Sequence, residues 1–172
     1  KAIILAGGLG TRLRPVTLEI PKPLIPIRNK TLTEHVFEVL HPHVDEFYLS
    51  IAHMADKIKD HFENKKFPFK IDFIHEKEPL GTAGPFIILN NKEHNFKETF
   101  VCVNGDNLFD INIKDMLEFH KKNNAIVTIG LSKVPEKYKK EEILPFGIAK
   151  LENNKILEFI EKPITKEAPS DY

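Results

Sequence analysis

A glycine-rich loop with basic neighbours is the strongest chemical signal in the sequence. Residues 7–12, called the glycine loop below, follow the first apolar run and include Gly7, Gly8 and Gly10. Glycines let the backbone turn sharply and bring its N–H groups close to an anion, because no Cβ stands in the way. Arg12 and Lys22 add positive charge near these N–H groups. The pattern predicts a site that holds several phosphates.

Two familiar phosphate-binding motifs do not fit this loop. The dinucleotide fingerprint needs a glycine three positions after its second glycine, where Leu13 stands, and the P-loop needs a Gly-Lys-Ser/Thr that the sequence lacks. A nicotinamide-dependent dehydrogenase is excluded as well, because no acidic residue ends a second strand at the usual distance. The loop by itself leaves open a tight turn between a strand and a helix that carries exposed basic residues.

Alternating hydrophobic periods predict an α/β fold. Short apolar runs alternate with segments of helical period, which is typical of β-α-β units and a mainly parallel sheet. Strands are expected at residues 2–6, 46–51, 70–75, 99–103, 125–132, 147–151 and 156–160, and helices at 32–40, 55–62 and 112–122. The Asn153-Asn154 pair predicts a hairpin between the last two strands.

Two of these strands have nearly continuous apolar sequences, which is typical of strands buried on both faces. They are residues 3–5 and 100–103, and Cys102 is therefore expected to be a small buried side chain. In open α/β sheets the ligand lies at the carboxyl ends of the strands. The loops that follow these two strands, at 7–14 and 104–107, are the places where we expect the chemistry.

The second loop contains Asp106 and predicts a metal ligand. Mg²⁺ is usually held by one or two carboxylates together with substrate phosphate oxygens and water. A single aspartate at the end of a strand fits part of that requirement. Residues 104–107 also fit a simple Asn-Gly-Asp turn, and the segment alone does not decide between the two interpretations.

Composition restricts the class of protein. The chain has 172 residues, of which 41% are hydrophobic, and this predicts one domain with a sizeable core. Lys plus Arg and Asp plus Glu both total 25, so neither a nucleic acid nor an anionic membrane is expected as a partner. No apolar run is long enough to span a bilayer. One cysteine fits a reducing compartment, so a cytoplasmic location is expected.

The string Gly-Gly-Leu-Gly-Thr-Arg-Leu, followed by Pro21-Lys22-Pro23, closely resembles the signature of the nucleoside-diphosphate-sugar pyrophosphorylases, or sugar-1-phosphate nucleotidyltransferases. Further landmarks follow in order at residues 76–84, 104–107, 145–148 and 161–163, so the resemblance covers nearly the whole chain. It is greatest to mannose-1-phosphate guanylyltransferases and to glucose-1-phosphate thymidylyl- and uridylyltransferases. The resemblance implies a Rossmann-like, glycosyltransferase-A-like nucleotidyltransferase fold with a C-terminal β-hairpin.

The resemblance also implies a reaction and a role for particular residues. The reaction is Mg²⁺-dependent transfer of a nucleoside monophosphate from a nucleoside triphosphate to a sugar-1-phosphate, with release of pyrophosphate. Arg12 is expected to bind the β- and γ-phosphates, Lys22 the α-phosphate and the incoming phosphate, and Asp106 the magnesium. The implied nucleotide-binding residues are Leu5, Ala6, Gly7, Gly8, Gly10, Thr11, Glu76, Gly81 and Thr82, and the implied sugar-phosphate-binding residues are Gly147, Glu161 and Lys162.

Two of these segments are weak signals on their own. The segment around Gly81 also fits a loop and a helix start capped by Thr82. Glu161 and Lys162 also fit an ordinary strand exit.

Members of the family continue beyond position 172, with an Asn-x-Gly segment and a second metal-binding aspartate. We therefore expect residues 1–172 to be a truncated catalytic domain that binds nucleotide and catalyses poorly. The alternative is a non-catalytic regulatory homologue that binds a nucleotide or a sugar nucleotide; the presence of Arg12, Lys22 and Asp106 favours the enzyme. The sequence leaves open which base and sugar are used, and whether the chain forms a homo-oligomer as relatives often do.

Overall fold

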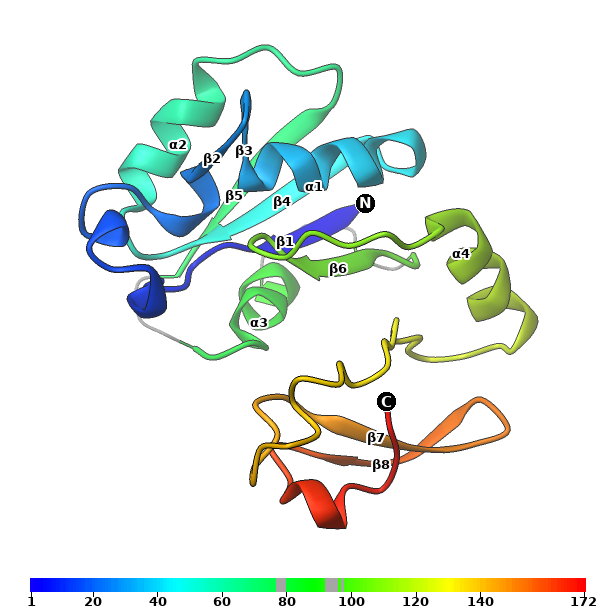
Figure 1. The fold of residues 1–172 in the computed structure, drawn as a ribbon. Coiled ribbons are helices and arrows are strands. Elements are labelled where there is room, and N and C mark those ends of the chain that lie inside the picture. The colour runs from blue at the N-terminus through cyan, green and yellow to red at the C-terminus, as the bar shows by residue number, and fades with distance from the viewer. Residues whose placement is uncertain (77–79, 92–95, 97) are drawn as a thin grey trace. The chain divides into compact units, whose positions relative to one another are not determined.

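The computed structural model describes residues 1–76, 80–91, 96 and 98–172 (Figure 1). These residues form two compact units, Lys1–Asp115 and Met116–Tyr172, and each unit is described by itself. The expected single domain over 1–172 stays a prediction.

A four-stranded parallel sheet is the centre of the first unit. It contains β1 (Ala2–Leu5), β4 (Glu46–Ile51), β5 (Lys70–His75) and β6 (Val101–Asn104), in the order β5-β4-β1-β6. The predicted strands at 46–51 and 70–75 are confirmed to the residue, and the expected parallel sheet is confirmed.

Helices cover both faces of this sheet, with α1 (Leu32–Leu40) and α2 (Ala55–Glu63) on one face and α3 (Gly84–Asn91) on the other (Figure 1). On the first face, the ring of Phe37 lies 4.8 Å from that of Phe47 and 5.5 Å from that of Phe62, measured between centroids. Such edge-on aromatic pairs add to the burial of apolar area. The predicted helices at 32–40 and 55–62 are confirmed.

On the opposite face, Leu89 of α3 packs in a core cluster with Ile3, Tyr48 and Ile74. Pairing in a parallel sheet places Ile3 beside Tyr48, so the side chains of β1 and β4 reach the same face. The cluster joins α3 to three of the four strands.

The start of α1 is fixed by a capping box. Thr31 accepts a hydrogen bond from the backbone N–H of Glu34, and the Glu34 carboxylate accepts one from the backbone N–H of Thr31 at 2.6 Å. Burial raises the pKa of Glu34, but hydrogen bonds from Lys65 and Thr31 outweigh burial and lower it to about 2. Glu34 is therefore an ionised, nearly buried anchor of the helix.

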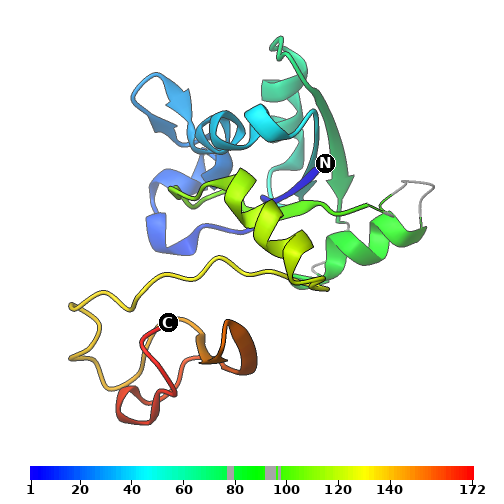
Figure 2. The same cartoon turned by 90° about the vertical axis from the view of Figure 1, so that its right-hand side faces the viewer.

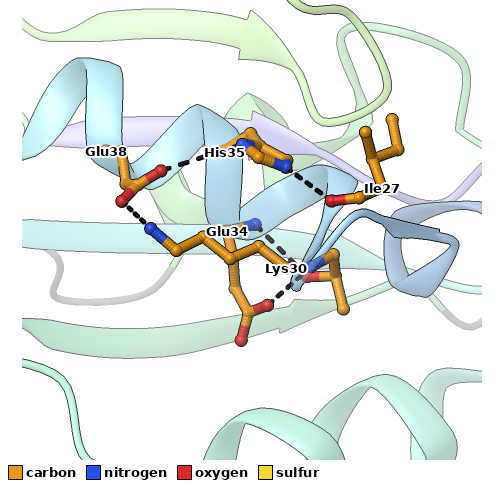
Figure 3. A network of polar contacts seen from close by, with 6 residues as sticks. Ile27, Lys30, Glu34, His35 and Glu38 are labelled. Carbon is orange, nitrogen blue, oxygen red and sulfur yellow. Dashed lines mark hydrogen bonds and ion pairs between the residues drawn. The ribbon is translucent and has the colours of Figure 1, made fainter.

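A short hairpin is attached to α1. It contains β2 (Pro26–Ile27) and β3 (Lys30–Thr31) and lies beside the helix (Figure 2). Figure 3 shows the contacts: Lys30 pairs with Glu38, and a ring nitrogen of His35 lies 3.1 Å from the Ile27 carbonyl oxygen. This hairpin connects the segment that carries Lys22 to α1.

The second unit contains the predicted C-terminal hairpin, formed by β7 (Ile148–Glu152) and β8 (Lys155–Ile160). Asn153 and Asn154 connect the strands with φ of +46° and +66°, as a turn with two left-handed residues requires. Val134, Leu144 and Ile148 form its core cluster.

The remaining elements are short, apart from one helix. Helix α4 (Ile113–Lys122) crosses the boundary between the units, and it confirms the helix predicted at 112–122. The 3-10 helices are η1 (Thr11–Leu13), η2 (Val16–Leu18), η3 (Lys22–Leu24), η4 (His41–His43) and η5 (Thr165–Glu167).

The strand predicted at 125–132 is wrong. This segment is irregular and lies in no paired strand, and Ile126 is 98% exposed while Val127 is 71% exposed. A strand needs a neighbour for its N–H and C=O groups, and no strand within the described ranges pairs with this segment. Its β-branched residues reflect local preference without a partner.

The expected burial of Cys102 is wrong as well. Cys102 is exposed, and β6 is an edge strand that pairs with β1 alone in the described sheet. Along β6, Val101 and Val103 are partly buried, whereas Cys102 and Asn104 are exposed. The continuous apolar run did not indicate a strand with two covered faces.

Candidate active site

The loops of the predicted site start at one edge of the sheet. Beyond the strands, the backbone N–H of Ala6 donates to Ser50, that of Glu76 to Ile51 and that of Gly105 to Leu5, at 2.9, 3.0 and 2.9 Å. These bonds continue the parallel ladders past the strand ends. The loops after β1, β5 and β6 therefore leave the sheet at the same carboxyl edge, with β4 between β5 and β1, as expected for a ligand site in an α/β fold.

The glycine loop offers free backbone donors. Within the part of the chain that the structure describes, no acceptor is available to the backbone N–H groups of residues 7–12. Gly10 has a φ of +61°, in the left-handed region that favours glycine. Unpaired N–H groups in a turn are suitable for binding an anion.

Two glycines at the strand ends are closely packed, and Gly105 more tightly than Gly7. A Cβ added to Gly105 would lie 2.8 Å from Cγ2 of Ile4, and one added to Gly7 would lie 3.3 Å from Cβ of Ala52. By contrast, a Cβ on Gly8 would meet no described atom within 4 Å. The space above Gly8 is open for a ligand.

The predicted basic and acidic residues lie around this loop. Lys22, the first residue of η3, has its Nζ 2.5 Å from Oδ2 of Asp106, and its Cβ would lie 3.3 Å from a Cβ on Gly10. The structure thus brings Lys22, Asp106 and the glycine loop together. Arg12 is exposed in η1 and has no hydrogen-bond or ion-pair partner in the described ranges, so its guanidinium is free for a ligand.

The donor set at Asp106 fits magnesium only in part. Asp106 supplies one partly exposed carboxylate, and no cluster of three or more His, Cys, Asp or Glu side chains suited to a metal occurs among the residues with described positions. Mg²⁺ is often held by few protein carboxylates together with substrate phosphates and water. The residues present are compatible with a metal that arrives with a triphosphate.

Glu76, at the end of β5, is held by neighbours on both sides. The buried hydroxyl of Ser50 donates to its Oε1, and the backbone N–H of Leu80 donates to its Oε2 at 3.4 Å. A Cβ on Gly84 would lie 2.7 Å from the same Oε2, so glycine leaves room for the carboxylate. Ser50 was missed by the sequence analysis; a lone polar residue in an apolar strand was the available signal.

The remaining nucleotide-binding candidates lie in the exposed segment before α3. Gly81 has a φ of +72°, and the N–H of Gly84 donates to its carbonyl at 3.0 Å. Thr82 is exposed, and it has no partner within the described ranges. Residues 77–79 of the same motif lie outside the described residues. Leu5 and Ala6 are the last residue of β1 and its neighbour.

The three sugar-phosphate candidates come together in the second unit. Ile148 pairs with Ile160, so Gly147 and Glu161 lie opposite one another, and a Cβ on Gly147 would overlap the ring of Phe159. The backbone N–H of Lys162 donates to Phe146 at 3.2 Å, and its Nζ lies 3.7 Å from Oε1 of Glu161. Their contact is observed; their role stays a prediction.

A hollow of about 320 Å³ lies elsewhere on the first unit. It is lined by His35, Val36, Glu38, Val39, Asn107, Leu108 and Phe109. Asn107 belongs to the loop 104–107 in which chemistry was expected, and the other six residues lie outside the predicted site segments.

A parallel sheet covered on both faces defines a Rossmann-like α/β protein. Its free loop amides and its Lys–Asp pair lie at the carboxyl ends of the strands, where such folds bind their ligands. The family model described as nucleotidyl transferase matches residues 1–172. The chain belongs to this family.

Known proteins similar to this chain are named as guanyltransferases and uridylyltransferases. The chain is 38% identical over 168 residues to mannose-1-phosphate guanyltransferase beta-B of Xenopus laevis, with 95% of this chain and 45% of that protein covered. It is 35% identical over 182 residues to a UTP–glucose-1-phosphate uridylyltransferase of Synechocystis, with 99% and 46% covered. The chain therefore spans about half the length of these relatives.

A solved structure has the same fold. HddC from Yersinia pseudotuberculosis, crystallised in complex with GMP-PN, superposes with a TM-score of 0.69 at 27% identity, covering 99% of this chain and 79% of that one. The predicted Rossmann-like fold is confirmed. No helix within the described ranges is long and apolar enough to cross a membrane.

Proposed function

We propose that this chain is the nucleotide-binding and phosphate-activating part of a sugar-1-phosphate nucleotidyltransferase. The observation that carries the proposal is the placement of Lys22, paired with Asp106, against the glycine loop, whose N–H groups have no acceptor in the described ranges. Membership of the nucleotidyl transferase family supports it.

The proposed reaction needs little chemistry from side chains. A sugar-1-phosphate is mostly a dianion at neutral pH, because the second pKa of a phosphate monoester is about 6. Its oxygen attacks the α-phosphorus of the nucleoside triphosphate without a general base. A bond forms between that oxygen and the α-phosphorus, the bond from the α-phosphorus to the bridging oxygen breaks, and pyrophosphate leaves with the electron pair.

The difficulty lies in bringing two polyanions together, so the residues act by position and charge. The free N–H groups of the glycine loop bind phosphate oxygens of the triphosphate. Arg12 binds the β- and γ-phosphates and stabilises the leaving pyrophosphate. Lys22 neutralises the α-phosphate and the incoming phosphate. To do so, its ammonium leaves Asp106 and pairs with the phosphate oxygens instead.

Asp106 is the proposed ligand of Mg²⁺, shared with triphosphate oxygens. The ion, when bound, neutralises charge on the phosphates. Release from Lys22 frees the Asp106 carboxylate for this role.

GTP with mannose-1-phosphate is the first substrate pair to test, since the Xenopus relative is named for that chemistry. UTP or dTTP with glucose-1-phosphate is the second, because few pocket contacts decide the choice of base. Gly147, Glu161 and Lys162 are the proposed contacts of the sugar phosphate. The triphosphate substrate and the single cysteine favour a cytoplasmic location, and a homo-oligomer is part of the same proposal.

The test compares pyrophosphate release by the wild-type protein with that of Arg12→Ala and Lys22→Ala. We expect both substitutions to lower turnover by roughly two orders of magnitude or more, because each removes a charge that stabilises the transition state. Lys66→Ala is the matched control: Lys66 is exposed and precedes β5, at the opposite end of the strand from the site.

Full activity in either site variant refutes the assignment. Thermal stabilisation by a triphosphate without pyrophosphate release from any substrate pair indicates the non-catalytic binding protein instead.

A further inference from the structure

We propose that Thr17 is a positioning residue that holds the glycine loop in the form that receives the triphosphate. The inference rests on the proposed function, because it assigns a determinant of that same site. Thr17 lies in η2, between the glycine loop and Lys22 in the sequence.

The burial pattern of η2 is the reverse of what hydrophobicity predicts. Thr17 is 3% exposed, whereas its apolar neighbours Val16 and Leu18 are 49% and 58% exposed. Burying a hydroxyl costs free energy unless it is hydrogen-bonded, so a buried threonine between exposed apolar residues indicates a specific contact.

That contact is with the glycine loop. Oγ1 of Thr17 donates to the carbonyl oxygen of Gly10 at 2.8 Å. The methyl group has a separate effect: Cγ2 of Thr17 would lie 2.8 Å from a Cβ on Gly10, so the side chain packs closely on this residue. Lys22 lies against Gly10 as well, with its Cβ 3.3 Å from the same Cβ position.

The hydroxyl helps to fix the direction of a backbone donor, because it bonds the Gly10 carbonyl oxygen, which also accepts from the backbone N–H of Leu13 at 2.9 Å. In a planar trans peptide the carbonyl of one residue and the N–H of the next point in opposite directions. With its oxygen bonded to Thr17, the peptide after Gly10 directs the N–H of Thr11 away from Thr17. This N–H is one of the loop donors without an acceptor in the described part of the chain. Thr17 thus orients the N–H of Thr11 toward the ligand without contacting the ligand itself.

Two substitutions separate the hydroxyl from the methyl group. Thr17→Val keeps the branched shape and removes the hydrogen bond, and Thr17→Ser keeps the hydroxyl and removes the methyl group. We expect Thr17→Val to raise the KM for the triphosphate about tenfold, which is the effect of one lost buried hydrogen bond. The KM for the sugar-1-phosphate stays within about twofold. Thr17→Ser keeps the triphosphate KM within about threefold of the wild type.

A merely structural role gives a different result. If Thr17 only stabilises the fold, Thr17→Val lowers the active fraction and hence the apparent kcat, with both KM values unchanged. That outcome overturns the proposal, as does a triphosphate KM for Thr17→Val equal to that of the wild type. If Thr17→Val does not fold, Thr17→Cys, a weaker donor, replaces it: a raised KM relative to Thr17→Ser supports the proposal, and equal KM values overturn it.

A failure of the proposed function gives a different result from a failure of the inference about Thr17. A wild-type protein that releases no pyrophosphate with any pair refutes the reaction, and Thr17 is then tested by the increase in Tm that GTP, UTP or dTTP produces. Loss of that increase in Thr17→Val and its retention in Thr17→Ser supports the inference; equal increases in both variants overturn it.

Discussion

Lys22 and Asp106 neutralise each other in the ligand-free protein, whereas in the proposed reaction each binds a different partner. Its side chains are 28% and 33% exposed, so water screens the pair, and such partly exposed pairs contribute roughly 0–1 kcal/mol to stability. A contact of this strength is easily exchanged for a phosphate on one side and a cation on the other. The pair is better understood as a ligand-free arrangement of the site than as a support of the fold.

Gly10→Ala should damage the site more than a change at the neighbouring Gly8. Alanine at a φ of +61° is strained by roughly 1–2 kcal/mol, and its Cβ would overlap Cγ2 of Thr17. We expect a fall in the free energy of unfolding of about that size or more, together with loss of triphosphate binding. Urea titration and a thermal shift with GTP measure the two effects.

Gly8→Ala is the control, because its Cβ meets no described atom within 4 Å. It should change the free energy of unfolding by less than about 0.5 kcal/mol. Equal unfolding curves for the two variants would falsify the strain argument.

The site residues that could be predicted from the sequence are those whose charge and glycine neighbours indicate phosphate binding. Arg12, Lys22 and Asp106 carry charge next to glycines, and the structure brings Lys22 and Asp106 into contact. Thr17 and Ser50 were not predicted, because their importance depends on contacts with Gly10 and Glu76 that lie outside their own segments. A hydroxyl in a buried position becomes informative only when the acceptor is known.

At the scale of the element, α1 is the best-defined part of the first unit. The helix begins at a capping box and ends beside the aromatic cluster around Phe37. It also anchors the β2–β3 hairpin through His35 and Glu38 (Figure 3). The Glu34 carboxylate accepts a hydrogen bond from the backbone N–H of Thr31 in β3, so its charge is exerted on the hairpin that follows the segment with Lys22.

Acid should destabilise the protein partly through Glu34. The pKa of Glu34 is about 2 in the folded protein and about 4.5 without these contacts. A depressed folded pKa contributes stability that is fully present above pH 4.5 and is lost as the pH falls toward 2. Because Lys65 is half exposed, we expect a contribution of about 1–3 kcal/mol at neutral pH.

Unfolding curves of the wild type and Glu34→Gln between pH 2 and 7 measure this contribution. The two should differ most near neutrality and converge near pH 2. Glu63→Gln is the control, because Glu63 is exposed and makes only a 3.6 Å pair with Lys59 among its described contacts. A constant difference between Glu34→Gln and the wild type at every pH contradicts the assignment.

Elements with a complete local pattern were predicted to the residue. The helix 32–40 has its cap and its apolar face in its own sequence, and the strand 46–51 is an apolar run with clear ends. The segment 125–132 has the same β-branched composition as a strand, but pairing depends on a neighbour elsewhere in the chain. The edge position of β6, and with it the exposure of Cys102, also depends on strand order.

At the scale of the whole molecule, the predicted ligand contacts divide between the units. All proposed contacts of the triphosphate lie within Lys1–Asp115. Lys22 of the same unit also meets the incoming phosphate in the proposed reaction, whereas Gly147, Glu161 and Lys162 lie within Met116–Tyr172. The two substrates should therefore protect different segments of the chain from exchange.

Hydrogen–deuterium exchange tests this division. A triphosphate alone should slow exchange of the free backbone amides of residues 7–12, because they gain acceptors. Residues 146–162 should change only when the sugar-1-phosphate is added. Protection of residues 146–162 by the triphosphate alone, without protection of residues 7–12, contradicts the proposed division.

The unpaired segment after α4 has a consequence for handling the protein. Residues 125–131 have strong β-propensity and contain neither a charge nor a proline, and Ile126 and Val127 are 98% and 71% exposed. Such a stretch offers a template for cross-β association between copies at high concentration. Lysines at 122 and 133 flank it as gatekeepers against aggregation. We therefore expect the solubility of the protein to depend on residues 125–131 and on the lysines that flank them.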